Sequence, residues 1–292
     1  MKVLVGGASG LIGSHLVPAL ESKGHQVSRL VRRPTAAPDE IVWNPNGPVG
    51  DLSGFDAVIH LGGETIMGRW TAAKKRRILE SRTVGTRNLA EALAPLGAGR
   101  SFLVASAIGY YGPHGDDFLT EDSPSGHDFL SLVGREWEHA TEPARQAGVR
   151  VVNLRSGVVL TPAGGALKQM LTPFRLGVGG RVGSGRQWMS WIALDDLVAA
   201  IVFLLENPAI SGAVNLVAPK PVTNADFTAA LAVALHRPAL LPVPATAVRL
   251  IFGEMGEATL LGSQRVAPKK LEAAGFKFRY SDVREALKAM LG

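Results

Sequence analysis

The stretch VLVGGASGLIGSHLVPAL, residues 3–20, decides the fold of this chain. It begins as an apolar strand, turns through glycines at three-residue spacing, and continues directly into an amphipathic helix. Gly7 permits the tight turn, Gly10 lets the backbone approach a pyrophosphate, and Gly13 lets the helix pack closely on the sheet. Free N–H groups at the helix N-terminus then face the phosphates. Strand, turn and helix in this order predict a dinucleotide-binding site. The residues expected to contact the dinucleotide here are Gly7, Ser9, Gly10, Leu11, Ile12 and Gly13.

The end of the second expected strand, QVSRLVRRP at residues 26–34, indicates which dinucleotide is bound. Sites selective for NAD usually place an acid here to hold the ribose 2′-hydroxyl, but Asp39 and Glu40 come only after a loop. Arg32 and Arg33 stand in that place instead. Because a guanidinium suits a 2′-phosphate, the sequence favours NADP(H) over NAD(H). The alternative is that both arginines are simply solvated at a strand end.

Short apolar runs alternate with helical patterns in the N-terminal half of the chain, as a parallel sheet with crossover helices requires. The expected strands are residues 2–5, 26–31, 57–61, 101–105 and 150–154, and the expected helices are 11–22, 71–79, 83–94 and 130–147. The strands are apolar on both faces, which fits burial between two helical layers. The predicted fold is therefore an α/β Rossmann-type, doubly wound parallel sheet with a smaller C-terminal substrate lobe.

A glycine-rich stretch, TPAGGALKQMLTPFRLGVGGRVGSGRQWMSW at residues 161–191, is too long for a simple connection. After it we expect helices at 194–205, 225–235 and 282–291 and a strand at 214–217. This organisation predicts two parts. Residues 1–160 with 192–218 form the NADP-binding Rossmann domain, and residues 161–191 with 219–292 form the substrate-binding lobe.

The composition narrows the class of protein. The 292 residues carry a formal charge of +6 but no cysteine, which removes disulfides and thiolate metal sites and suits a reducing compartment. We therefore expect a cytoplasmic protein. No apolar stretch reaches the ~18 residues of a membrane span, so no membrane partner is expected. The histidines show no metal-ligand spacing, so no metal is expected either.

The densest positive cluster is KKRR at residues 74–77. It lies in a helical pattern with no interleaved aromatic residues, which favours a solvated helix face over a nucleic-acid patch. A nucleic-acid-binding protein is accordingly the weakest of the functional hypotheses. Steep salt dependence of DNA binding would revive it.

Several motifs together carry a family resemblance: GASGLIG (7–13), FDAVIHLGGE (55–64), RTVGTRNLAEAL (82–93), SAIGYYG (106–112), PFRLGVGG (173–180), GSGRQ (183–187) and WIALDDLVAAI (191–201). The chain resembles the extended short-chain dehydrogenase/reductases, the branch of sugar-nucleotide epimerases and dehydratases, and most of all their atypical "epimerase family" proteins of unassigned substrate. The likeness runs essentially end to end. It implies an NADP-binding Rossmann domain with a C-terminal substrate lobe. The further cofactor contacts expected along these motifs are Leu61, Gly62, Gly63, Arg82, Ser106 and Val159.

The chain departs from the resemblance at the catalytic pair. Members with known chemistry use a tyrosine and a lysine four residues later, the lysine lowering the tyrosine pKa so that the phenol can act as general acid or base. None of the three tyrosines here is followed by a lysine at that distance. The helix expected to carry the pair has Leu130 and Gly134 instead. The usual dyad is missing.

A second departure is Arg82, which stands where the extended branch usually has asparagine before V-x-G-T. An arginine here is placed to reach the cofactor phosphates or an anionic substrate. A surface ion pair with Glu80 or a neighbour is the equally weighted alternative.

The remaining catalytic candidates are Ser106, Tyr110, Tyr111 and Glu64. The first three follow the fourth expected strand of the main sheet, at the carboxyl edge where ligands bind in open α/β sheets. A hydroxyl or phenol there can polarise a carbonyl, although the two tyrosines can equally be pocket wall. Glu64 is the other possible acid or base, unless it caps a segment or binds the ribose. His60, inside an apolar strand, is expected in the core.

The glycine-rich stretch and its flanks provide the candidate substrate residues Arg155, Arg175, Arg186 and Trp188. A mobile loop carrying arginine and tryptophan can close on an anionic or planar substrate. Trp191 is better explained by core packing. Asp195 and Asp196 are expected as the N-cap and first-turn acids of the next helix.

These observations favour an NADP(H)-binding oxidoreductase or epimerase-like enzyme with an atypical active site and a small-molecule substrate. The alternative is a catalytically inactive NADP(H)-binding sensor or regulatory protein, which the missing dyad would allow. Turnover followed at the nicotinamide absorbance band separates the two.

Overall fold

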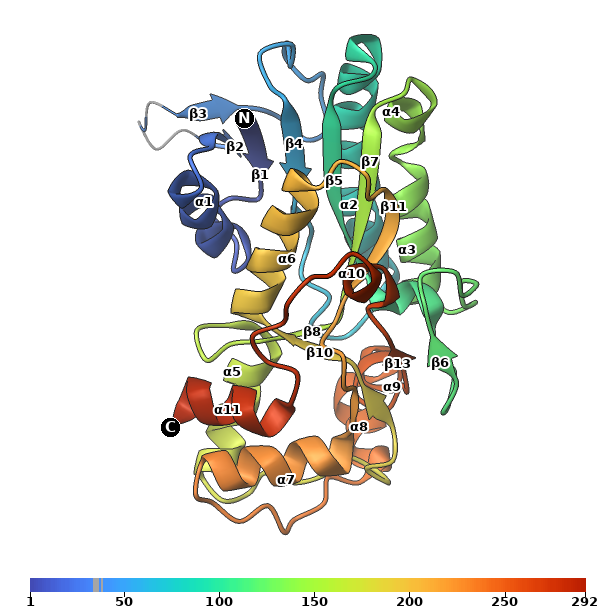
Figure 1. Ribbon diagram of the computed structural model, residues 1–292. Coiled ribbons are helices and arrows are strands. Elements are labelled where there is room, and N and C mark those ends of the chain that lie inside the picture. The colour runs from blue at the N-terminus through green and yellow to red at the C-terminus, as the bar shows by residue number, and fades with distance from the viewer. Residues whose placement is uncertain (34–36, 38) are drawn as a thin grey trace.

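The computed structural model, which describes residues 1–33, 37 and 39–292, contains a seven-stranded sheet with the order β11-β7-β5-β4-β1-β2-β3 (Figure 1). The strands are β1 (Lys2–Gly6), β2 (Gln26–Val31), β3 (Glu40–Val42), β4 (Ala57–His60), β5 (Ser101–Ala107), β7 (Arg150–Ser156) and β11 (Gly212–Leu216). Every neighbouring pair is parallel. The predicted Rossmann-type fold is confirmed.

Helices cover both faces of the sheet. The first face is covered by α1 (Gly13–Ser22) and α6 (Leu194–Glu206), and the second by α2 (Ala72–Leu93), α3 (Phe129–His139) and α4 (Glu142–Gln146). Alternate side chains of each strand point to opposite layers, so Ile59 packs with the first helices and Val58 with the second. Burial on both sides explains the nearly continuous apolar strands.

Below the sheet in Figure 1 lies a smaller lobe. Its helices are α5 (Gly165–Arg175), α7 (Asn224–Ala234), α8 (Ala245–Phe252), α9 (Glu254–Thr259) and α11 (Val283–Leu291). Two-stranded pairs join β8 (Val158–Leu160) to β10 (Trp191–Ala193), β9 (Trp188–Met189) to β12 (Val222–Thr223), and β6 (Phe118–Leu119) to β13 (Arg265–Val266). A core around Leu167, Phe174 and Trp191 holds α5 and α7 together. Trp191 is fully buried, as expected.

The C-terminal residues pack partly against the seven-stranded sheet and partly in the smaller lobe. Leu271 of α10 (Lys269–Ala273) and Phe276 pack in the core of the sheet, whereas Leu287 packs in the lobe. Asp196 anchors this crossing, because its carboxylate accepts the N–H groups of Arg279 at 2.7 Å and Tyr280 at 3.0 Å. The division of the chain into two domains at the stated boundaries stays a prediction.

Several expected elements differ from those observed. Residues 71–79 and 83–94 form one helix, α2, because the good helix formers between them do not interrupt it. The expected helix 130–147 breaks after Ala140, just before Pro143 enters the first turn of α4. The N-cap of α6 is Ala193 and not an aspartate, while Asp195 and Asp196 lie in its first turn. Among the described residues, no helix is long and apolar enough to cross a bilayer.

Candidate functional site

The glycines of the first turn serve different purposes. Gly7 adopts a φ of +81°, which favours glycine, and a side chain there would meet the Gly62 nitrogen at 3.0 Å. A side chain on Gly13 would collide with the carbonyl oxygen of Gly7 and the backbone of Ala8. An added Cβ on Gly10 meets only the carbonyl oxygen of Gly7, at 3.2 Å. Gly7 and Gly13 are therefore required by packing, whereas the open side of Gly10 is free for a ligand.

The surroundings of this turn bring further predicted cofactor residues together. The Leu61 nitrogen donates to the carbonyl oxygen of Gly6 at 2.8 Å, so Leu61, Gly62 and Gly63 continue beside the turn. Gly164 lies against the side chain of Leu11, which follows the turn. Val159 belongs to β8, the strand that precedes Gly164 in the chain. Within the described part of the chain, the N–H groups of Leu11 and Ile12 have no acceptor. These two donors are available to a phosphate at the N-terminus of α1.

Arg82 reaches this region from α2. Its Nη1 donates to the carbonyl oxygens of Glu64 at 2.9 Å and Ile78 at 3.1 Å, and its guanidinium lies against Gly63 and over the Trp137 ring. Burial lowers the pKa of Arg82 to about 10, so the side chain remains a cation at neutral pH. The expected alternative, an ion pair with Glu80, is not found among the described residues.

Arg32 and Arg33 directly follow β2, the strand that pairs with β1 above the glycine turn. Both side chains are exposed, and neither has a hydrogen-bond or ion-pair partner among the described residues. Asp39, the nearest acid in sequence, is instead paired with Arg29 at 3.2 Å. The two arginines thus remain free at the strand end where the sequence predicts the 2′-phosphate.

Two of the candidate hydroxyls are buried and already bonded. The Ser106 Oγ donates to a carboxylate oxygen of Glu138 at 2.8 Å. The Tyr111 hydroxyl donates to Asn215 at 2.7 Å and accepts from Arg155 Nη1 at 2.9 Å. Burial raises the pKa of Tyr111 to about 12. Ser106 and Tyr111 therefore hold the interior together, and the structure does not support them as groups that meet a substrate.

Arg155 belongs to the same buried network. It is only 4% exposed, and its Nε and Nη2 make a two-pronged ion pair with Glu138, each at 2.8 Å. The guanidinium also covers the ring of Tyr110 at 3.5 Å from the centroid. The role of Arg155 in binding substrate stays a prediction, and in this structure its guanidinium donates to Glu138 and Tyr111.

Tyr110 differs from the other candidates. It is half-buried on the 3₁₀ turn η2 (Ile108–Tyr111), and its hydroxyl has no partner among the described residues. Its ring is fixed by Arg155 on one face and by Tyr111 edge-on at 5.4 Å. Of the three predicted hydroxyls, Tyr110 alone combines a fixed ring with an unoccupied oxygen.

The helix that lacks the dyad packs directly on this turn. Leu130 of α3 lies against Gly109, and a side chain on Gly134 would meet the Tyr110 Cα at 3.0 Å. A lysine at position 134 would have to displace the backbone that carries Tyr110. The missing dyad is therefore matched by a close contact between α3 and the turn that carries Tyr110.

Glu64 lies at the start of the segment that follows β4. Its carboxylate accepts from Lys74 Nζ at 2.7 Å, with Arg77 Nε at 3.9 Å. The hydrogen bond from Lys74 lowers the pKa of Glu64, which keeps it ionised at neutral pH. Glu64 can thus serve as a base but not as an acid, and its role stays a prediction.

The predicted substrate residues of the glycine-rich stretch lie on different elements, and their role stays a prediction. Arg175 ends α5 and Arg186 precedes β9, and both are exposed. Trp188 donates from Nε1 to Asp116 at 2.7 Å, and Arg265 lies over its ring at 4.3 Å. Local sequence does not indicate Glu138, Asn215 or Arg265 as partners of the candidate residues, because each contact joins segments far apart in the chain.

His60 is confirmed as a core residue, being 3% exposed with no partner for either ring nitrogen. Burial lowers its pKa to about 4 from the usual 6.5. The unfolded chain therefore binds a proton between these values that the folded protein does not. The free energy of unfolding is expected to fall by about 3 kcal/mol as pH drops from 6.5 to 4, and to be insensitive to His60 above 6.5.

Urea unfolding of the parent and of His60→Leu across this pH range tests the assignment. The leucine variant should show a pH profile flatter by about that amount. An identical slope in both proteins would exclude His60 as the titrating group.

Comparison with known proteins supports the resemblance. The family model described as the NAD dependent epimerase/dehydratase family matches residues 3–216, and a domain of unknown function matches residues 243–290. An epimerase family protein of Mycobacterium bovis is 46% identical, covering 98% of this chain and 96% of its own length. The human epimerase family protein SDR39U1 is 38% identical over the whole of both chains.

A crystal structure of human SDR39U1 with NADPH superimposes with a TM-score of 0.91 at 36% identity, covering 100% of this chain and 99% of that one. The complete fold is thus shared with the human protein. The chain belongs to the NAD dependent epimerase/dehydratase family.

Proposed function

We propose that this protein is an NADP(H)-dependent oxidoreductase or epimerase-like enzyme that acts on a small molecule. This proposal rests on the glycine turn with the open side of Gly10, and on Arg32 and Arg33 at the end of β2. Among the described residues, the Leu11 and Ile12 N–H groups of this turn have no acceptor and the two arginines have no partner. NADPH in the human SDR39U1 structure supports this choice of cofactor. We infer the cytoplasm as its compartment from the absence of cysteine.

The residues present fit the dinucleotide. Leu11 and Ile12 N–H groups would hold the pyrophosphate, Arg32 and Arg33 the 2′-phosphate, and Arg82 an anionic oxygen near Gly63. When bound, the nicotinamide supplies or accepts a hydride. The Tyr110 hydroxyl would then give a proton to, or take one from, the substrate oxygen. Arg155, held by Glu138, fixes the Tyr110 ring for this step.

The second candidate is an NADP(H)-binding sensor without catalysis. It is favoured by one observation: the hydroxyls of Ser106 and Tyr111 bond within the protein, so that Tyr110 is the one candidate whose hydroxyl has no partner among the described residues. Oxidation or reduction of a panel of carbonyl and alcohol compounds, followed at the nicotinamide absorbance band, tests the enzyme. NADPH binding without turnover across the panel would favour the sensor.

Cofactor choice provides a separate prediction. Replacing both Arg32 and Arg33 by alanine should weaken NADPH binding roughly 10- to 100-fold, because charge-assisted hydrogen bonds to the 2′-phosphate are lost. Binding of NADH should change little. Fluorescence titration with each nucleotide measures both affinities.

The matched control is Arg76→Ala with Arg77→Ala, which removes the same charge from exposed positions on α2. That control should keep the parent preference for NADPH. Equal affinities of the parent for NADPH and NADH would contradict the proposed role of Arg32 and Arg33.

A further inference from the structure

Charge is segregated in the C-terminal lobe. Residues 161–193 and 227–253 contain no aspartate or glutamate. The lysines and arginines in these two segments are Lys168, Arg175, Arg181, Arg186, Arg237 and Arg249. Folding brings these two segments side by side, because the Val243 nitrogen donates to the carbonyl oxygen of Arg181 at 2.8 Å. The Nε of Arg237 likewise donates to the carbonyl oxygen of Arg175 at 3.2 Å. These two segments are therefore rich in cations, with Arg249 paired to Glu257 at 2.6 Å and the exposed Asp226 standing at the start of α7.

Large apolar side chains are exposed on the same end of the lobe. They are Leu176 (72%), Val178 (53%), Val233 (74%), Leu240 (83%) and Leu241 (57%). We call the surface formed by these five residues with Arg175, Arg181 and Arg237 the distal face. In Figure 1 the elements that carry it, the end of α5, α7 and the segment after α7, lie at the end of the molecule away from the sheet. Several large exposed apolar side chains at one end of a protein point to an interaction site.

The helix α7 carries apolar side chains both on its buried side and on its exposed side. Its inner side buries Phe227 and Leu231 in the lobe core, while Ala229 and Val233 point outward and are exposed. A helix that is apolar all round normally has both sides covered. The acid in its first turn, Asp226, accepts a hydrogen bond from the Thr223 hydroxyl. The outer side of α7 therefore lacks a partner within the described chain.

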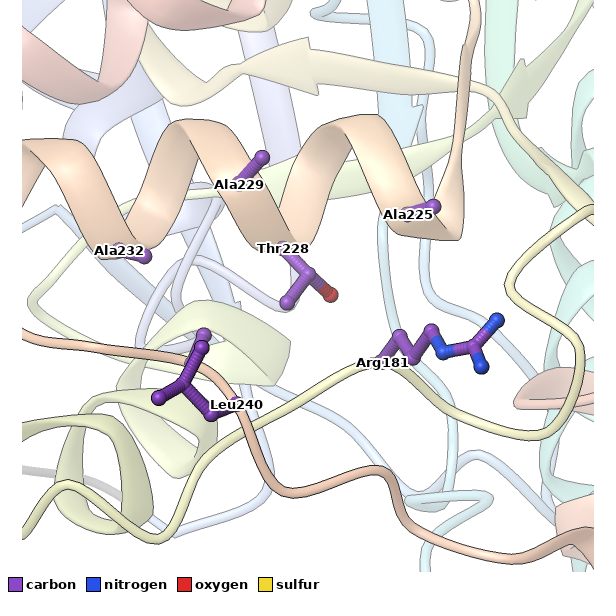
Figure 2. A pocket seen from close by; sticks show the side chains of 7 residues that line it. Arg181, Ala225, Thr228, Ala229, Ala232 and Leu240 are labelled. Atoms are coloured by element: carbon purple, nitrogen blue, oxygen red, sulfur yellow. The ribbon is translucent and has the colours of Figure 1, made fainter.

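A hollow of about 360 Å³ opens on the distal face (Figure 2). It is lined by Ala225, Thr228, Ala229 and Ala232 of α7, by Ala239 and Leu240, and by Arg181. The Arg181 Nη1 donates to the carbonyl oxygen of Ser184 at 3.0 Å, and no carboxylate pairs with this side chain among the described residues. Figure 2 shows Arg181 at one end of the row of small side chains. An apolar floor with a cation at its end suits an amphiphile with an anionic head.

We propose that the distal face docks on an anionic phospholipid surface. Exposed leucines and valines would enter the boundary between headgroups and acyl chains, while the arginines would meet lipid phosphates. Two copies of this chain joined through the same face would bring three arginines against three others, which disfavours a symmetric dimer. Because no described helix spans a bilayer, the protein would lie on the membrane. It is an alternative to the sequence-based expectation of no membrane partner.

The purified full chain is to be sedimented with vesicles of phosphatidylcholine alone or with one third phosphatidylglycerol. We expect binding to the anionic vesicles, little binding to the neutral ones, and loss of binding at high salt. Equal binding to both vesicle types, or none to either, would overturn the proposal. NADPH affinity is measured in parallel, so a failure of the cofactor site is recognised separately.

Two double variants divide the contributions. Arg181→Gln with Arg237→Gln should weaken partition into anionic vesicles about 30-fold, and Leu240→Ser with Leu241→Ser should weaken it at least roughly 10-fold. The matched controls are Arg76→Gln with Arg77→Gln, and Leu250→Ser with Ile251→Ser, which remove equal charge and similar exposed apolar surface elsewhere. Equal losses in the controls would refute a specific face.

Circular dichroism and NADPH binding confirm that each variant is folded. Size-exclusion chromatography tests the alternative that a second copy of this chain binds to the distal face. A dimer that Leu240→Ser with Leu241→Ser dissociates, with no vesicle binding by the parent, would assign the face to a second copy instead.

Discussion

Gly10→Val is expected to abolish NADPH binding while the protein stays folded. The backbone of Gly10 lies outside the left-handed region, so valine introduces no conformational strain there. The Cβ of the valine would meet only the carbonyl oxygen of Gly7, at 3.2 Å. On the open side it would hold the pyrophosphate away from the Leu11 and Ile12 N–H groups. Losing two charge-assisted hydrogen bonds weakens binding by roughly 10²- to 10⁴-fold.

The neighbouring glycine serves as the contrast. Gly13→Val would force its side chain into the carbonyl oxygen of Gly7 and the backbone of Ala8, so it should lose the fold together with binding. Thermal unfolding and circular dichroism of both variants, with NADPH titration, distinguish the two effects. Normal binding by a folded Gly10→Val would mean that the pyrophosphate does not lie at this turn.

Local sequence patterns predict the Rossmann half of this protein well. The run from β1 through the turn into α1 is decided by neighbours in the chain, and every main-sheet strand except β3 lies in an apolar run that the sequence predicted. The edge strand β3 went unpredicted, since its three residues include the partly exposed Glu40 and the exposed Ile41 and Val42. The helix α5 was hidden by Gly164, Gly165 and Pro173 at its ends, which read as loop signals.

The partners of the site residues could not be predicted, because they come from distant segments. Glu138 meets Arg155 and Ser106 only after α3 packs beside β5 and β7. Nothing in the local sequence distinguishes such an acid from the many that face solvent on helices. Asn215 gave a weak signal, as a polar residue within the apolar strand β11. Side-chain networks of this kind depend on tertiary packing, so the sequence named the site residues without showing which of them are free.

The hydroxyls of Ser106 and Tyr111 bond within the protein, whereas that of Tyr110 has no partner among the described residues. The three candidates can therefore be tested separately. Tyr110→Phe should leave NADPH affinity nearly unchanged and slow turnover by ~10²–10⁴-fold, the usual contribution of general acid–base catalysis. Ser106→Ala and Tyr111→Phe remove hydroxyls that bond within the protein, so they should lower the free energy of unfolding by about 1–3 kcal/mol and affect turnover much less. Initial rates at the nicotinamide absorbance band and urea unfolding measure the two quantities.

Because the phenylalanine variant keeps the ring under Arg155, it removes one oxygen and little else. A matched variant, Tyr110→Leu, also removes the ring on which Arg155 stacks, and should add a loss of stability to the same loss of turnover. If Tyr110→Phe turns over at the parent rate, the phenol is not the acid or base. Glu64 then becomes the group to replace, and Glu64→Gln should reduce turnover most at pH values where the carboxylate is ionised, since its pairing with Lys74 holds its pKa low.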